Sequence, residues 1–200
     1  MPGKTREGRA KNAGHPTRRV RYAVAMSLDG FIAGPRGEAD WIVMDSGDEA
    51  AFDFNAFYSQ FDTILMGRRS YEFVKGAGGG GSTPGMQVFV FSRTLRQEDH
   101  PGVTIVDDPV GLMAELRSQP GKDVWLWGGG SLFRSFAELG LVDTVEVGVM
   151  PVLLGEGVPL LPPPAKRVAL KLTGHKLDAK TGSVSLEYAV QYGRGTKRRR

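Results

Sequence analysis

The stretch LWGGGSLF, residues 126–133, decides the fold together with its counterpart LMGRRSYE at residues 65–72. Each begins as an apolar, strand-like run, reaches glycine and continues in residues typical of a helix start. Backbone N–H groups point outward at such a turn, and the helix dipole favours negative charge there. Two such turns in one small domain therefore predict a site that binds two parts of one phosphorylated ligand.

Three arginines strengthen this prediction. Arg68 and Arg69 follow the first glycine turn, and Arg93 follows a third apolar run. They supply cations for an anion that backbone amides alone would hold loosely, which favours a dinucleotide. The structural alternative for glycines 128–130 is tight packing of a strand on a helix. For Arg68 and Arg69 it is a solvated helix start paired with nearby acids.

Composition bounds the class of protein. The chain has 200 residues, 40% hydrophobic and 24% charged, which fits one globular domain with a real core. It contains no apolar stretch long enough to cross a bilayer, and no apolar segment follows the first cations as in a secretory signal. Zero cysteines exclude disulfides and thiolate chemistry and fit a cytoplasmic protein.

The net charge of +4 is unevenly distributed. Residues 1–21 hold seven Lys and Arg residues against the single acid Glu7, and residues 194–200 add five more with no acid. We therefore expect disordered basic tails at 1–20 and 193–200 around an acidic domain at 21–192. Binding of nucleic acid by the tails is the alternative, although no aromatic side chain in 1–20 offers a stacking platform.

Strand-like and helix-like segments alternate along the body, and a hairpin follows them. This order predicts an α/β fold, with a mostly parallel central sheet, flanking helices and an antiparallel C-terminal hairpin. The expected strands are 21–33 (ending in a turn), 63–66, 87–91, 103–106, 124–127, 142–149, 168–176 and 183–192. The expected helices are 48–61, a segment opened by Gly67, 109–119 and 131–138.

Other functional motifs are missing. The glycines do not form the G-x-G-x-x-G fingerprint or a P-loop, and no serine sits in a nucleophile elbow. His15, His100 and His175 are scattered, so the sequence predicts no metal site.

Five ordered segments carry a family resemblance: AMSLDGFIAGPRGEADWI at 25–42, ILMGRRSYE at 64–72, VFSRTL at 90–95, residues 125–157 and the final hairpin. Residues 21–192 resemble the dihydrofolate reductase-like superfamily. Within it they are similar to the reductase domain of the bifunctional riboflavin-biosynthesis deaminase-reductase.

The resemblance implies NADPH as cofactor. Gly67 would approach the adenosine and pyrophosphate side, with Arg69 beside it, and Arg68 with Ser92 and Arg93 would bind the 2′-phosphate. The resemblance places the pyrophosphate at a glycine turn that often has an unusual glycine–glycine peptide, here Gly128, Gly129, Gly130, Ser131 and Leu132. Ala25 and Ile32 would contact the nicotinamide end through their backbones, under a mobile loop at 34–40.

The resemblance also implies hydride transfer with a positioned acid. Asp53 and Asp48, near the aromatic helix, are the candidate catalytic acids. Ser27, Asp29 and Trp41 are the candidate substrate contacts. For a substrate phosphate, Arg36, Lys75 and Arg134 are candidate cations.

The predicted activity is therefore an NADPH-dependent reduction of a small heterocycle, similar to the 5-amino-6-(5-phosphoribosylamino)uracil reductase reaction. Dihydrofolate reduction is an alternative, but Gly148 stands where folate enzymes usually carry a threonine. The zinc motifs of the deaminase half are absent. A non-catalytic NADPH-binding module is a further alternative. A homodimer paired through the sheet edge is expected from the resemblance.

Overall fold

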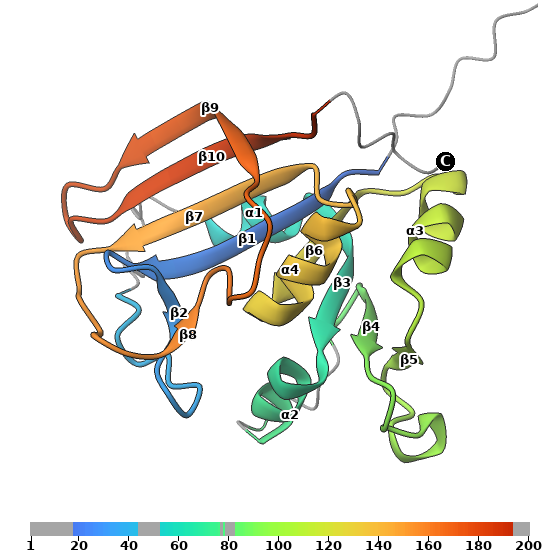
Figure 1. Cartoon of the computed structure of the whole chain (residues 1–200). Helices are drawn as coiled ribbons and strands as arrows, with labels where there is room; N and C mark the ends of the chain where they lie inside the picture. The colour runs from blue at the N-terminus through green and yellow to red at the C-terminus, as the bar shows by residue number, and fades with distance from the viewer. Residues whose placement is uncertain (1–17, 44–52, 77, 79–82, 194–200) are drawn as a thin grey trace, which may run out of the picture.

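The computed structural model describes residues 18–43, 53–76, 78 and 83–193 and contains a twisted eight-stranded sheet (Figure 1). The strand order is β5-β4-β3-β6-β1-β7-β10-β9. Five successive pairings, from β5 to β7, are parallel, and β10 and β9 join antiparallel. The strands are β1 Val20–Ser27, β3 Phe61–Gly67, β4 Gln87–Phe91, β5 Thr104–Val106, β6 Asp123–Gly128, β7 Thr144–Met150, β9 Ala169–Leu177 and β10 Val184–Gln191. The predicted fold class is confirmed.

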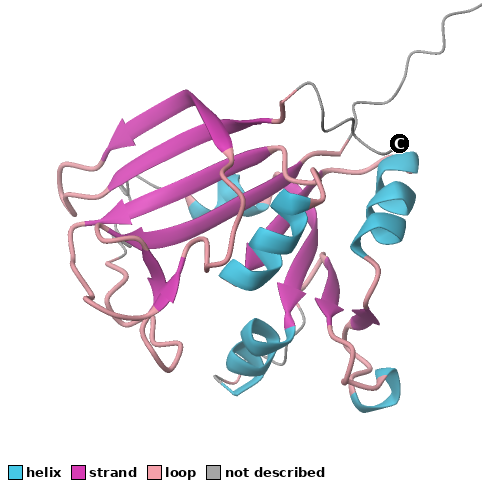
Figure 2. Cartoon of the chain, viewed as in Figure 1, coloured by secondary structure: helices cyan, strands magenta, loops and turns pink. Residues whose placement is uncertain are grey.

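Helices cover both faces of this sheet (Figure 2). They are α1 Phe54–Tyr58, α2 Arg68–Gly76, α3 Pro109–Ser118 and α4 Gly130–Glu138, with a short 3-10 turn, η1, at Gln97–Asp99. One apolar core joins α3 and α4 to the sheet around Met113, Phe133 and Phe136. A second core on the other face packs Tyr71 of α2 and Phe57 of α1 against the sheet. The parallel strands thus lie between two apolar layers, with their carboxyl ends at one edge.

A small second sheet stands beside those carboxyl ends. It pairs β2 (Phe31–Ala33) with β8 (Val158–Pro159), which the sequence did not predict as a strand. The Leu160 N–H also donates to the Gly30 carbonyl oxygen at 2.9 Å. The proline-rich loop after β7 is thereby held against the turn between β1 and β2.

The predicted helix over residues 48–61 is wrong at its C-terminal end. Within the described residues it covers only α1, and Phe61 already begins β3. The ring of Phe61 nevertheless lies 4.9 Å from that of Phe57 and 5.8 Å from that of Trp125. The regular aromatic spacing reflects one shared cluster, which is filled partly from a helix and partly from a strand.

The N-terminal boundary also differs from the expectation. Arg18, which the expectation places in the basic tail, is 5% exposed, and Arg21, the first residue of the expected domain, is 7% exposed. Arg18 pairs with Asp62, and Arg21 pairs with Glu146 at 2.6 Å. These arginines are therefore part of the folded domain, because acids from β3 and β7 neutralise them. Arg19 is described as well and pairs with Asp123 at 2.6 Å, whereas the remaining tail charges, in residues 1–17 and 194–200, lie outside the described residues.

Candidate functional site

The two glycine turns lie side by side. β3 and β6 are neighbouring parallel strands, and Met66 is paired with Gly128. A Cβ atom added at Gly67 would lie 3.7 Å from the Gly128 carbonyl oxygen and 3.8 Å from the Leu132 Cβ. Each strand runs directly into a helix, α2 or α4 (Figure 1). The structure therefore brings both helix starts to the same edge of the sheet, as the sequence predicted.

The second turn requires glycine. The Gly128–Gly129 peptide is cis, and Gly128 has φ of +145°. A Cβ atom at Gly130 would lie only 2.4 Å from the Pro159 carbonyl oxygen. Gly129 caps α4 without a side-chain hydrogen bond. The Leu132 and Phe133 N–H groups donate to the Gly129 carbonyl oxygen at 3.0 and 3.1 Å, so an anion at this helix start would be met by the Gly130 and Ser131 N–H groups.

Ser70, which sequence reasoning missed, belongs to this cradle. A Cβ atom added at Gly129 would lie 3.4 Å from its hydroxyl oxygen. Ser70 comes from the first turn of α2, so a hydroxyl donor stands between the two glycine turns. Its place within MGRRSYE, directly after the arginines, was the signal available in the sequence.

The predicted 2′-phosphate residues also come together. Arg68 donates through its terminal nitrogen to the Thr94 hydroxyl at 2.7 Å. The Ser92 hydroxyl accepts from the N–H groups of Thr94 and Leu95 at 3.2 and 3.0 Å. Ser92 and Arg93 line an open pocket of about 330 Å³ together with Leu95, Gln97, Ile105, Val106 and Asp107. Arg69 lies next to Arg68 with its side chain exposed. Thr94 and Asp107 are additions that the sequence did not single out.

At the opposite end, Ala25 and Ile32 lie half-buried on β1 and β2. Ala25 is paired with Gly148 of β7, which contributes no side chain to this end of the sheet. The hydroxyl expected of a folate enzyme is therefore absent at that position. A Cβ atom at Gly148 would meet the Met150 side-chain methyl at 3.3 Å.

Ser27 and Asp29, the predicted substrate contacts, are engaged within the protein. Ser27 is fully buried, and its hydroxyl donates to the Asp29 carboxylate at 2.6 Å. That carboxylate also accepts from the N–H groups of Leu154 and Gly155 at 3.1 and 2.7 Å. The Ser27 hydroxyl, followed by these N–H groups, lowers the pKa of Asp29. The two side chains therefore hold the turn after β1 against the loop after β7. Their contact with substrate stays a prediction.

The loop at 34–40 is braced by Glu38. Its carboxylate accepts from the Arg36 side chain at 2.7 Å and from the Arg36 N–H at 2.8 Å. The Glu38 carbonyl oxygen accepts from the Trp41 indole at 3.0 Å. Arg36 is thus already paired, and Trp41 is held by its own loop. The backbone N–H of Glu38 itself, followed by the Arg36 side chain and the Arg36 N–H, lowers the pKa of Glu38.

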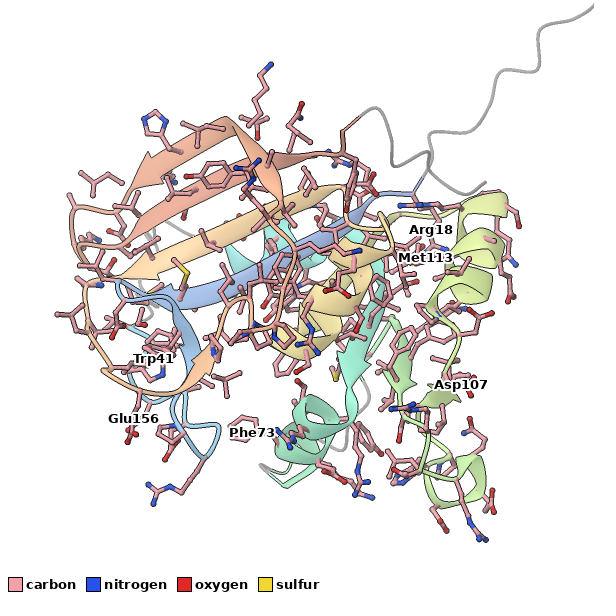
Figure 3. All side chains as sticks on the ribbon, in the orientation of Figure 1. Arg18, Trp41, Phe73, Asp107, Met113 and Glu156 are labelled. Atoms are coloured by element: carbon pink, nitrogen blue, oxygen red, sulfur yellow. The ribbon has the colours of Figure 1, made fainter. Side chains whose placement is uncertain are left out.

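This loop reaches α2 across the site. A Cβ atom at Gly37 would lie 3.5 Å from the ring of Phe73, which is 46% exposed. Figure 3 shows Phe73 on α2 and Trp41 beside β2. An exposed phenylalanine of α2 therefore lies against the loop at 34–40.

The candidate acids are less well placed. Asp53 is exposed and serves as the N-cap of α1, where its carboxylate accepts from the Ala56 N–H at 2.8 Å. Asp48 lies outside the described residues. The structure therefore gives Asp53 a capping role, and its catalytic role stays a prediction. Arg134, a candidate for a substrate phosphate, instead donates to carbonyl oxygens of the proline-rich loop at 3.3–3.5 Å.

Two classes of site find no support in the described part of the chain. No group of His, Asp and Glu side chains gathers there as metal ligands would. None of its helices is both long and apolar enough to cross a membrane.

The sheet order and the paired glycine turns define a dihydrofolate reductase-like α/β domain. The chain belongs to the RibD C-terminal domain family, which matches residues 18–181. It is 36% identical over 182 residues to the uncharacterized protein YyaP of Bacillus subtilis, a match that covers 86% of this chain and 94% of YyaP.

Solved structures agree on the fold. A putative riboflavin biosynthesis protein from Shewanella sp. PV-4 superposes with a TM-score of 0.73 at 24% identity, covering 88% of this chain and all of the other. The dihydrofolate reductase of Enterococcus faecalis, solved with NADP(H), gives a TM-score of 0.63 at 15% identity, covering 87% of this chain and 97% of that enzyme.

Proposed function

We propose that this chain is an NADPH-dependent reductase of a small heterocycle, of the riboflavin-biosynthesis reductase type. The observation that carries the proposal is the joint position of the two glycine turns and the Arg68–Ser92–Arg93 cluster at one sheet edge. The glycines offer backbone N–H groups without side chains, and the arginines offer charge some distance away. A dinucleotide with a 2′-phosphate carries its negative charge at two separate places in the same way, on the pyrophosphate and on the 2′-phosphate.

The residues fit such a cofactor. Gly128, Gly129 and Ser70 form a cradle that larger side chains would fill, and the α4 helix start faces it. Arg68 and Arg93 present guanidinium groups suited to a phosphate dianion. A bound nicotinamide dinucleotide would supply the hydride. The chain's own part is to hold the phosphates, to orient the ring next to β1 and to restrict water through the loop at 34–40.

In this proposal, Phe73 and the Glu38-braced loop flank the substrate end. A planar heterocycle stacks on an exposed aromatic ring better than a flexible chain does. Lys75, exposed in the last turn of α2, is the remaining candidate for a substrate phosphate, because Arg36 and Arg134 are engaged elsewhere.

The first experiment measures NADPH binding and then NADPH oxidation, with the riboflavin-pathway pyrimidine phosphate and dihydrofolate as parallel substrates. Oxidation with the pyrimidine supports the proposal, and oxidation with dihydrofolate selects the alternative enzyme. Binding without turnover indicates a non-catalytic module. Absence of NADPH binding overturns the proposal.

A pair of variants tests the phosphate site. Arg68→Ala with Arg93→Ala weakens NADPH far more than NADH, because only NADPH carries the 2′-phosphate. The matched control is Arg96→Ala, an exposed arginine in the same loop that reaches Glu98 at 3.9 Å. Equal weakening of both cofactors would show that these arginines do not read the 2′-phosphate.

We also propose a homodimer formed through β9, which is one of the two edge strands of the sheet. Its Leu170 and Leu172 side chains are 43% and 50% exposed, and an uncovered edge strand favours pairing with another strand. Light scattering of the wild type and of Leu172→Asp tests this. A monomeric wild type contradicts the proposal.

A further inference from the structure

The predicted 2′-phosphate end contains two carboxylates as well as its arginines. Glu72 accepts from the Arg68 side chain at 2.7 Å, four residues along α2. Both side chains are about half exposed, at 48% and 46%. One edge of the Arg68 guanidinium is therefore already occupied by an anion, and Thr94 occupies its other edge. A phosphate that approaches Arg68 must share it with Glu72 or displace Glu72.

Asp107 is the second carboxylate. It follows β5 and lines the same pocket as Ser92 and Arg93 (Figure 3). The Ser92 N–H donates to the Val106 carbonyl oxygen at 2.9 Å, which fixes the ends of β4 and β5 next to each other. The pocket thus combines one arginine with one carboxylate, although a site for a dianion would be expected to carry arginine alone.

The two cofactors respond to a carboxylate in opposite ways. A carboxylate near the adenosine ribose accepts a hydrogen bond from a free 2′-hydroxyl, whereas it repels a 2′-phosphate. Like charges that share a site disfavour each other's ionised form. The carboxylates therefore reduce the advantage of NADPH over NADH without reducing the affinity for NADH.

We propose that Glu72 and Asp107 set the ratio of NADPH to NADH affinity by competing with the 2′-phosphate for Arg68 and Arg93. The wild-type chain accordingly binds both cofactors with a modest preference for NADPH. This inference rests on the proposed function, since it concerns the same cofactor site.

The test uses Glu72→Gln, Asp107→Asn and the double variant in the full chain. Each removes a negative charge and keeps the size of the side chain. Dissociation constants for NADPH and for NADH are measured by calorimetry at low and at physiological salt. The matched control is Glu115→Gln, which removes one exposed negative charge from α3. Thermal unfolding of each variant checks that it is folded.

Each single neutralisation is expected to tighten NADPH about fivefold and to leave NADH within about twofold, with a larger effect at low salt. The double variant combines both gains, and the control shifts neither cofactor. Equal changes for NADPH and NADH, or no change, overturn the inference. Weaker NADPH binding by Glu72→Gln also overturns it, because Glu72 would then hold Arg68 in its binding orientation.

The outcome for the wild type separates this inference from the proposed function. If the wild type binds neither cofactor, the proposed function fails, and the inference fails with it. If the wild type binds NADPH but the variants keep its NADPH-to-NADH ratio, only the role of Glu72 and Asp107 is lost.

Discussion

The Asp29 carboxylate accepts a hydrogen bond from the Gly155 N–H at 2.7 Å, across 126 positions of the chain. This bond, with those from Leu154 and Ser27, fastens the turn after β1 to the loop after β7. The two segments frame the predicted nicotinamide end of the site. A single ionised side chain therefore fixes the geometry of that end.

Replacing Asp29 by Asn lowers the unfolding temperature at neutral pH, because the neutral side chain accepts these N–H groups less strongly. The pKa of Asp29 is lowered in the folded protein, first by the Ser27 hydroxyl. Its contribution to stability is therefore present above the ordinary value of 3.8 and is lost as the pH falls through the lower folded pKa. Thermal unfolding of both proteins between neutral pH and pH ~3 measures the difference.

The matched control is Asp40→Asn, an exposed carboxylate in the neighbouring loop. It is expected to change the unfolding temperature little at any pH. If Asp29→Asn behaves in the same way, the bonds to Leu154 and Gly155 do not stabilise the fold.

The parts of the site that sequence could predict are those defined by local chemistry. Glycine before a helix start marks both turns, and the Ser92–Arg93 pair follows a strand, so their shared edge follows from parallel topology. The role of Asp29 could not be predicted, because its partners Leu154 and Gly155 are distant in the chain. In the sequence alone, a polar turn residue that binds a ligand cannot be distinguished from one that binds a neighbouring loop.

The charge pattern of the N-terminal segment led to an incorrect boundary for a similar reason. Arg18 continues a basic run and is therefore expected in the tail, and Arg21 extends that run into the first residue of the expected domain. Their acids, Asp62 and Glu146, lie on strands that only the fold brings next to them. The composition shows how many charges the chain carries, whereas the pairing of strands decides which of them are buried.

Replacing Tyr22 by Phe is expected to raise the free energy of unfolding by about 1 kcal/mol. The Tyr22 hydroxyl is the one buried side-chain polar atom without a hydrogen-bond partner among the described residues. Burial raises the pKa of Tyr22 and keeps the hydroxyl neutral. Its ring stacks on Phe133 with centroids 4.0 Å apart, a contact that Phe preserves. Denaturant unfolding measures the change.

Tyr71→Phe provides the comparison for this prediction. The Tyr71 hydroxyl is 2.9 Å from the His100 Nδ1, so its loss is expected to reduce stability by about 1 kcal/mol. A loss of stability in both variants would show that the Tyr22 hydroxyl has a partner, such as a buried water.

Replacing Arg21 by Met is expected to reduce stability by about 3 kcal/mol, because Glu146 is left buried without its cation. Arg21 also lies over the Phe61 ring, with its guanidinium carbon 4.7 Å from the centroid. Adding Glu146→Leu recovers most of the loss. Denaturant unfolding of the single and double variants tests this.

The control for Arg21 is Arg19→Met. Arg19 pairs with Asp123 at 2.6 Å but is 57% exposed, so its replacement is expected to cost under about 1 kcal/mol. A comparable loss at Arg19 and Arg21 would contradict the assignment of the stability to burial.

The glycines of the cradle separate structural from binding roles. Gly130→Ala is expected to reduce stability by about 1–3 kcal/mol, because its Cβ would lie 2.4 Å from the Pro159 carbonyl oxygen. Gly67→Ala meets only ordinary contacts, the nearest at 3.7 Å, and a less flexible unfolded chain gives it about 0.4–1 kcal/mol of added stability.

Gly67→Ala is nevertheless expected to weaken NADPH about tenfold, or about 1.4 kcal/mol, because the methyl group occupies the space through which a phosphate approaches the backbone. Calorimetry with NADPH and denaturant unfolding on the same variant measure the two effects together. A stable Gly67→Ala protein with unchanged NADPH affinity would place the phosphates away from this turn. A stable protein with reduced NADPH affinity shows that ligand binding requires glycine at Gly67, whereas the stability of the fold requires glycine at Gly130.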